Sequence, residues 1–143
     1  MLEPTQRQHL LQALCPPEGY ELTFAIGTTY SLDLMALLSV PLAFAQFDWE
    51  DAAGRPAADP LALLEALRRY ADRLHIFCQV GAIAVPAKTQ LLFGYLENSV
   101  FQVQAPNKGG VFHPKLWVLR FTAPDQPVLY RLLCLSRNLT FDR

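Results

Sequence analysis

The chain has 143 residues, the length of one domain, and can bury a core without help from a metal or a disulfide. Its hydrophobic fraction of 52% and charged fraction of 17% make it apolar for a soluble domain. We therefore expect it to hide surface against the rest of a longer polypeptide, of which it would be an N-terminal part, or against a second copy of itself. The net charge of −1 argues against a general nucleic-acid binder.

Hydrophobic periodicity predicts helices and strands in an order typical of an α/β fold with a mixed sheet flanked by helices. Helices are expected over residues 5–14, 32–47 and 61–74. Strands are expected over residues 20–26, 75–80, 83–85, 90–93, 99–104, 112–121 and 133–140. A proline-containing hairpin loop over 122–127 joins the last two strands. Residues 1–143 are thus interpreted as a single domain.

The helix boundaries follow from capping residues and prolines. Thr5 is expected to cap the first helix, Ser31 the second and Asp59 the third, while Pro41 should kink or split the second. The loop 27–30 before the Ser31 cap could also hold an anion at the helix N-terminus. Without a glycine-rich pattern, an ordinary capped βα unit is the preferred interpretation.

Polar side chains interrupt the last two apolar strands at matched positions. His113 and Lys115 are two residues apart, as are Ser136 and Asn138, so each pair leaves one face of a strand. If the two strands are neighbours, an imidazole, an ammonium, a hydroxyl and a carboxamide gather at one point. This set suits a phosphate, because it combines a nucleophile, a fixed positive charge and neutral hydrogen-bonding groups.

The pattern resembles the phospholipase D superfamily, whose signature is a His-x-Lys strand followed by a strand with Gly-Ser-x-Asn. The resemblance is carried by about the last 35 residues, and it implies an α-β-α sandwich with a metal-independent phosphodiesterase site. It also implies that His113 attacks phosphorus to form a phosphohistidine, that Lys115 and Asn138 bind the phosphoryl oxygens, and that Ser136 supports them. A second His-x-Lys half-site is implied as well, supplied by a homodimer or by a later domain.

Two positions depart from the family pattern. Arg120 stands where the family usually has an aspartate, and Leu135 stands where most members have a glycine. These departures favour an alternative of a different class, a non-catalytic phospholipase D-like domain that binds a partner or acts as a scaffold. Convergence of the four side chains on one open pocket would discriminate between the two.

Charge is distributed unevenly along the chain. Residues 1–74 hold five Lys or Arg and ten Asp or Glu, whereas residues 75–143 hold seven and three. The basic second half contains the motif, and its cations, Arg120 and Arg131 among them, either face an anionic substrate or line exposed strand faces. With no membrane-binding amphipathic stretch, a nuclease is preferred over the second alternative, a phospholipid hydrolase.

The sequence predicts no disulfide, metal site, cofactor or membrane-spanning segment. Cys15, Cys78 and Cys134 are odd in number and lack C-x-x-C spacing, which indicates free buried thiols in a reducing compartment. The histidines have no metal-type spacing to them, so neither a metal site nor a cofactor is predicted. No signal-peptide pattern is evident, and the apolar run 34–44 is too short to span a bilayer. The sequence therefore predicts a cytoplasmic protein without stable membrane insertion.

Overall fold

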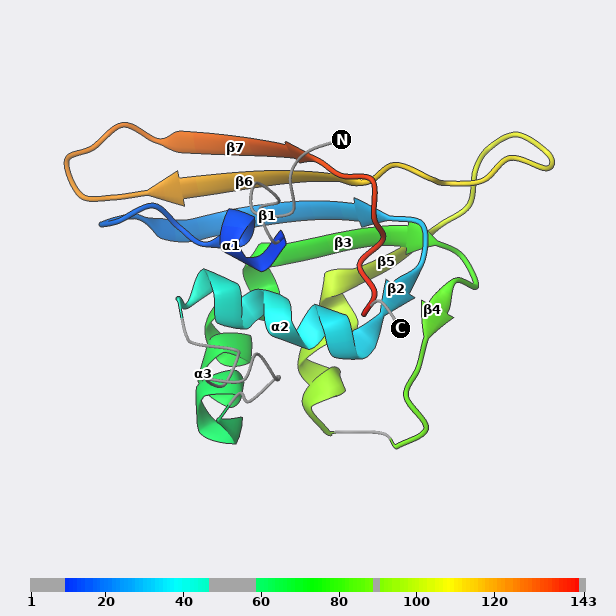
Figure 1. Cartoon of the computed structure of the whole chain (residues 1–143), viewed down its shortest axis with the longest axis horizontal. Helices are drawn as coiled ribbons and strands as arrows, with labels where there is room; N and C mark the ends of the chain where they lie inside the picture. The colour runs from blue at the N-terminus through cyan, green and yellow to red at the C-terminus, as the bar shows by residue number, and fades with distance from the viewer. Residues whose placement is uncertain (1–9, 47–58, 89–90, 142–143) are drawn as a thin grey trace, which may run out of the picture.

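The computed structural model describes residues 10–46, 59–88 and 91–141. The first elements are α1 (Leu10–Leu14), β1 (Glu21–Thr29), β2 (Leu32–Asp33), α2 (Leu34–Phe44), α3 (Pro60–Tyr70) and the 3-10 turn η2 (Ala71–Arg73). The remaining ones are β3 (Leu74–Gln79), β4 (Ile83–Ala84), the 3-10 helix η3 (Leu91–Ser99), β5 (Val100–Val103), β6 (Leu116–Thr122) and β7 (Leu129–Cys134). The expectation of an α/β fold with a mixed sheet flanked by helices is confirmed (Figure 1).

The main sheet has five strands in the order β5-β3-β1-β6-β7, and β2 and β4 form a separate pair. Strands β5, β3 and β1 are parallel, whereas β6 and β7 run antiparallel as the predicted hairpin. Leu116 at the start of β6 pairs with Cys134 at the end of β7. Trp117 pairs with Gly27 near the carboxyl end of β1. The start of β6 and the end of β7 therefore lie at the edge of the sheet where β1 and its parallel neighbour β3 end.

One face of the main sheet forms the core with the helices. Its strand residues are almost completely buried, as Trp117 at 2% exposure and Ile76 at 0% show, and they pack in one cluster with residues of α2 and α3. Gly27 lies among them. A Cβ on Gly27 would come within 2.7 Å of Ile76 Cδ1 and 2.9 Å of the Trp117 ring, so any other residue would have to displace these side chains.

The opposite face of the sheet is apolar and open to solvent. Phe24 on β1 is 39% exposed, and Tyr130 and Leu132 on β7 are 70% and 65% exposed. Aromatic rings nevertheless pack along this face, for example those of Phe24 and His75 with centroids 4.9 Å apart. Because the described helices lie on the other side of the sheet (Figure 1), none of them covers these side chains.

The region after β1 differs from the prediction. The strand continues through residues 27–29 instead of ending in a loop, and β2 follows before the helix begins. Asp33, not Ser31, is the N-cap of α2, because its carboxylate accepts a hydrogen bond of 2.8 Å from the Met35 backbone N–H. The predicted Ser31 cap is therefore wrong. Pro41 lies inside α2 without splitting it.

Other boundaries were also mispredicted. The apolar run at 91–93, expected as a strand, begins η3, and the third helix ends at Tyr70 because η2 follows. The Asp59 cap is confirmed by a hydrogen bond of 3.1 Å from the Leu61 N–H. The predicted Thr5 cap lies outside the described residues. None of the described helices is long and apolar enough to cross a membrane.

The cysteines are free, as expected, but they are not all buried. Cys78 is buried and Cys15 half-buried, and burial raises the pKa of both thiols, an effect that the charge of Arg131 partly offsets at Cys15. Cys134 is exposed. It occupies the open sheet face because it pairs with Leu116 and alternates with the half-buried Leu133.

Candidate functional site

The four motif residues lie where the β6–β7 hairpin meets the carboxyl end of β1. His113 and Lys115 precede β6, and Ser136 and Asn138 follow β7. The strands are neighbours, as predicted, but none of the four residues is within them, so the expectation that they project from strand faces is wrong. The Leu135 N–H donates a hydrogen bond of 2.8 Å to the Lys115 carbonyl and holds the two segments side by side.

His113 and Lys115 are in direct contact. The Lys115 Nζ lies 3.1 Å from both His113 Nδ1 and His113 Nε2. The contact places a fixed positive charge beside a ring that can act as a nucleophile when it is neutral.

Asn138 is tied to the end of β1. Its Oδ1 accepts a hydrogen bond of 3.2 Å from the Tyr30 backbone N–H and lies 3.4 Å from the Thr29 hydroxyl oxygen. The Tyr30 ring in turn packs against the His113 imidazole, with centroids 5.3 Å apart and planes tilted by 44°. Tyr30 therefore touches both halves of the motif, a role that its sequence position does not reveal.

Thr29 fixes the segment that carries Asn138. Its side chain is buried, at 2% exposure for the residue, and its hydroxyl accepts a hydrogen bond of 2.9 Å from the Leu139 N–H. The same hydroxyl donates its single proton over 2.7 Å to the Ser31 carbonyl, so the longer approach to Asn138 is the weaker contact. The Leu139 carbonyl accepts from the Asp33 N–H, which anchors the segment on its other side.

Ser136 is the least integrated of the four. It lies exposed on a bend after Leu135, and within the described residues no hydrogen bond joins its hydroxyl to the other three. The structure thus places His113 in contact with Lys115 and Tyr30, and Asn138 in contact with Tyr30, whereas within the described residues no hydrogen bond joins Asn138 to His113 or Lys115. Arg137, between Ser136 and Asn138, is also exposed.

Two arginines of the basic second half have structural contacts elsewhere. Arg120 donates to the Thr23 hydroxyl over 2.9 Å. Arg131 donates over 2.7 Å to the carbonyls of Ala13 and Cys15, and it packs over a core aromatic ring. None of these contacts involves a motif residue.

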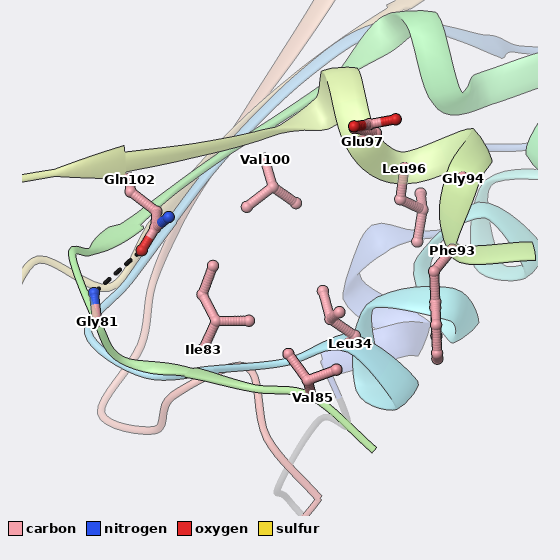
Figure 2. A pocket seen from close by; sticks show the side chains of 10 residues that line it. All are labelled: Leu34, Gly81, Ile83, Val85, Phe93, Gly94, Leu96, Glu97, Val100 and Gln102. Carbon is pink, nitrogen blue, oxygen red and sulfur yellow. Dashed lines mark hydrogen bonds between the residues drawn. The ribbon is translucent and has the colours of Figure 1, made fainter. Parts of the chain in front are cut away.

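A cavity lies apart from the motif. It has a volume of about 610 Å³, and none of the four motif residues lines it. Figure 2 shows Leu34, Ile83, Val85 and Phe93 around it, with Gln102 at one side accepting a hydrogen bond of 3.0 Å from the Gly81 N–H. Its walls are mainly apolar, so it does not resemble a phosphate site.

Two ion pairs lie at the amino end of β1, away from the motif. Glu21 contacts Arg73 at 2.7 Å and Arg69 at 3.3 Å. The hydrogen bond from Arg73, with the charges of both arginines, lowers the pKa of the Glu21 carboxyl although partial burial opposes it. Among the described residues, no group of three or more His, Cys, Asp or Glu side chains could hold a metal ion.

Comparisons with protein-family models, with curated proteins and with solved structures find no significant match to this chain.

Thr29 and Tyr30 are the site residues that sequence reasoning missed. Their position carried a usable signal, because ligands of α/β sheets commonly bind beyond the carboxyl ends of parallel strands. The segment 27–30 was interpreted as an exit loop or as a weak anion site. Once β1 is placed next to the hairpin, its last residues necessarily face the motif.

Proposed function

We propose that the chain is a phospholipase D-like domain, with the helix-covered face of its sheet as one side of an α-β-α sandwich, and that it forms one half-site of a phosphodiesterase acting on nucleic acid. The observation that carries this proposal is the contact between the His113 ring and Lys115 beside Asn138 at the carboxyl end of β1. A nucleophile, a fixed cation and a carboxamide at one end of a sheet match the needs of a phosphoryl group.

The reaction proceeds in two balanced steps. A ring nitrogen of His113 attacks the phosphorus, a P–N bond forms, and the P–O bond to the leaving alcohol breaks while a second half-site supplies the proton. Water, which gives a proton to the second half-site, then attacks the phosphohistidine; a P–O bond forms, the P–N bond breaks, and a phosphate monoester and the free imidazole are released. Lys115 and Asn138 hold the phosphoryl oxygens in both steps, with Ser136 as a supporting group.

The second half-site comes from a second copy of the chain or from a later domain. The open apolar face of the sheet, with Tyr130 and Leu132, supports association of this kind because such a face is usually covered. Nucleic acid is the preferred substrate because the half of the sequence that carries the motif has a net charge of +4.

The test is cleavage of a labelled oligonucleotide by the chain in a form that contains both half-sites. We expect His113→Ala to abolish cleavage with little loss of binding, and Lys115→Ala to weaken both, by on the order of 10² or more in rate. Activity should survive EDTA, and trapping should give an acid-labile, base-stable phosphohistidine. His75→Phe, a change at a histidine on the open sheet face, is the matched control and should retain activity.

Metal-dependent cleavage, or wild-type turnover by His113→Ala, would contradict the mechanism. A specific observation also favours the non-catalytic alternative. Arg120, at the position where the family has an acid, hydrogen-bonds Thr23 and does not contact His113. If the protein binds oligonucleotide and shows no turnover with both half-sites present, the chain is a binding or scaffold domain.

A further inference from the structure

The contacts of Tyr30 join the two halves of the motif, although nothing in its sequence position assigns it a role. Its ring packs against the His113 imidazole at a centroid distance of 5.3 Å. Its backbone N–H donates to Asn138 Oδ1 over 3.2 Å. One residue thus contacts the proposed nucleophile through its side chain and the proposed phosphate ligand through its backbone.

The backbone of Tyr30 is itself held in place. Its carbonyl accepts a hydrogen bond of 3.1 Å from the Gln79 N–H, which links it to the end of β3. The Gln79 side chain, in turn, accepts a hydrogen bond of 2.6 Å from the Phe112 N–H, one residue before His113. The ring and the amide of Tyr30 are therefore presented from the rigid ends of two parallel strands.

The hydrogen bond to Asn138 also decides which end of the carboxamide is available. Because Oδ1 accepts from Tyr30, the NH₂ group is the end of Asn138 left to meet a ligand. An NH₂ group donates two hydrogen bonds and suits phosphoryl oxygens, whereas a carboxamide oxygen would repel them. The same contact thereby gives Asn138 the polarity that an anion site requires.

Packing against a ring restricts the rotation of His113. The imidazole is on an exposed residue outside any strand, and the described residues bring it no carboxylate. The ring of Tyr30 takes the orienting role that a carboxylate has at many catalytic histidines. The Tyr30 hydroxyl forms no hydrogen bond within the described residues, so the ring itself provides the contact.

We propose that Tyr30 is the positioning residue of this site, orienting the His113 imidazole with its ring and the Asn138 carboxamide with its backbone N–H. The proposal rests on the proposed function for its catalytic consequence, but its structural content is independent of turnover. The two effects can be separated. Substitution of the Tyr30 side chain removes the ring that orients His113 and leaves the backbone N–H that orients Asn138.

The structural test is an NMR comparison of Tyr30→Ala and Tyr30→Phe in the full chain. The His113 ring protons experience the ring current of Tyr30, so their resonances should move toward unshifted positions in Tyr30→Ala and stay near wild-type positions in Tyr30→Phe. The Asn138 side-chain amide resonances should stay in place in both. Tyr130→Ala, which removes an exposed tyrosine from the open sheet face, is the matched control.

The functional test measures cleavage of the same oligonucleotide by the form with both half-sites. Tyr30→Ala should lower kcat by on the order of 10- to 100-fold with a smaller change in KM, because a misplaced nucleophile costs rate more than binding. Tyr30→Phe should restore the rate. If Tyr30→Ala does not fold, Tyr30→Leu fills the space without an aromatic ring and serves the same comparison.

The outcomes separate this inference from the proposed function. Unchanged His113 resonances in Tyr30→Ala overturn the positioning role, whether or not the wild-type protein turns over. Wild-type kcat in Tyr30→Ala overturns its catalytic consequence. An inactive wild-type protein in which the His113 resonances still respond to Tyr30→Ala overturns the proposed function and leaves the positioning of His113 supported.

Discussion

Replacing Thr29 by valine should detach the Asn138 segment from β1 at a cost that the structure allows us to estimate. Valine has nearly the same shape, so the change removes a hydroxyl and leaves the packing in place. The hydroxyl accepts from the Leu139 N–H over 2.9 Å and donates to the Ser31 carbonyl over 2.7 Å. Both hydrogen bonds are lost, and neither partner finds a substitute on a valine.

The size of the effect follows from burial. Leu139 is 7% exposed and Thr29 is 2% exposed, so water does not readily replace the lost acceptor. An unsatisfied buried N–H costs about 1–3 kcal/mol, and loss of the second hydrogen bond adds about 1 kcal/mol, since Ser31 is only partly buried. We therefore expect Thr29→Val to lower the free energy of unfolding by about 2–4 kcal/mol.

Urea unfolding followed by circular dichroism measures this change. With an m-value of about 2 kcal/mol/M, the midpoint should fall by about 1–2 M at unchanged m. Thr28→Val is the matched control, because its hydroxyl forms comparable contacts with the Leu116 backbone in an exposed position where water can replace it. The reasoning fails if both variants shift the midpoint equally, or if exchange of the Leu139 amide is no faster in Thr29→Val.

Two further predictions concern other parts of the molecule. Because Arg73 depresses the pKa of Glu21, the ion pair should stabilise the fold above the ordinary carboxyl pKa of 4.5 and lose this effect as the pH falls through the lowered pKa. Glu21→Gln should therefore reduce the difference in unfolding midpoint between pH 7 and pH 3, and an unchanged difference would contradict the role of the ion pair. The chain should form dimers through the open sheet face when light scattering is measured at increasing concentration, and Leu132→Lys should shift it to monomer. Leu61→Lys, at a leucine of α3 that is 74% exposed, should leave the dimer intact, and a wild-type chain that stays monomeric at high concentration would refute the association.

Periodicity predicted the main sheet well because long apolar runs with turn residues between them leave few alternatives. It failed at residues 91–93, because a short apolar run fits a buried strand and a helical turn equally well. It also failed at Ser31. A serine before an apolar run has the pattern of a cap, but tertiary pairing of Leu32 with Ile83 inserts β2 and moves the N-cap to Asp33.

The sequence could not predict whether Cys134 is buried or exposed, because of the composition of strands β6 and β7. Both faces of these strands are apolar, with Trp117 and Leu119 on one side and Leu116 and Val118 on the other. Alternation identifies two faces but does not say which of them the helices cover. The sequence thus predicted that the two strands pair, although it placed the second at 133–140 instead of 129–134. The choice between the faces depended on α2 and α3 packing against the sheet.

The four motif residues met for a different reason from the one the sequence suggested. Strand alternation placed His113 and Lys115 on one face, yet they precede β6, and Ser136 and Asn138 follow β7. Their proximity follows from the antiparallel hairpin, since the residues before its first strand must lie beside those after its second.

The β6–β7 hairpin alone would leave the four motif residues at an end of the hairpin with no further contact to hold them. Here β6 also pairs with β1 so that Gly27 faces Trp117, which places the next residues of β1 beside the motif. The Thr29 hydroxyl holds the Leu139 N–H, and Tyr30 holds Asn138 and packs on His113. Because β1 is anchored between two strands of the sheet, its end is the rigid part of the candidate site. Its last residues therefore determine how precisely the motif can be oriented for chemistry.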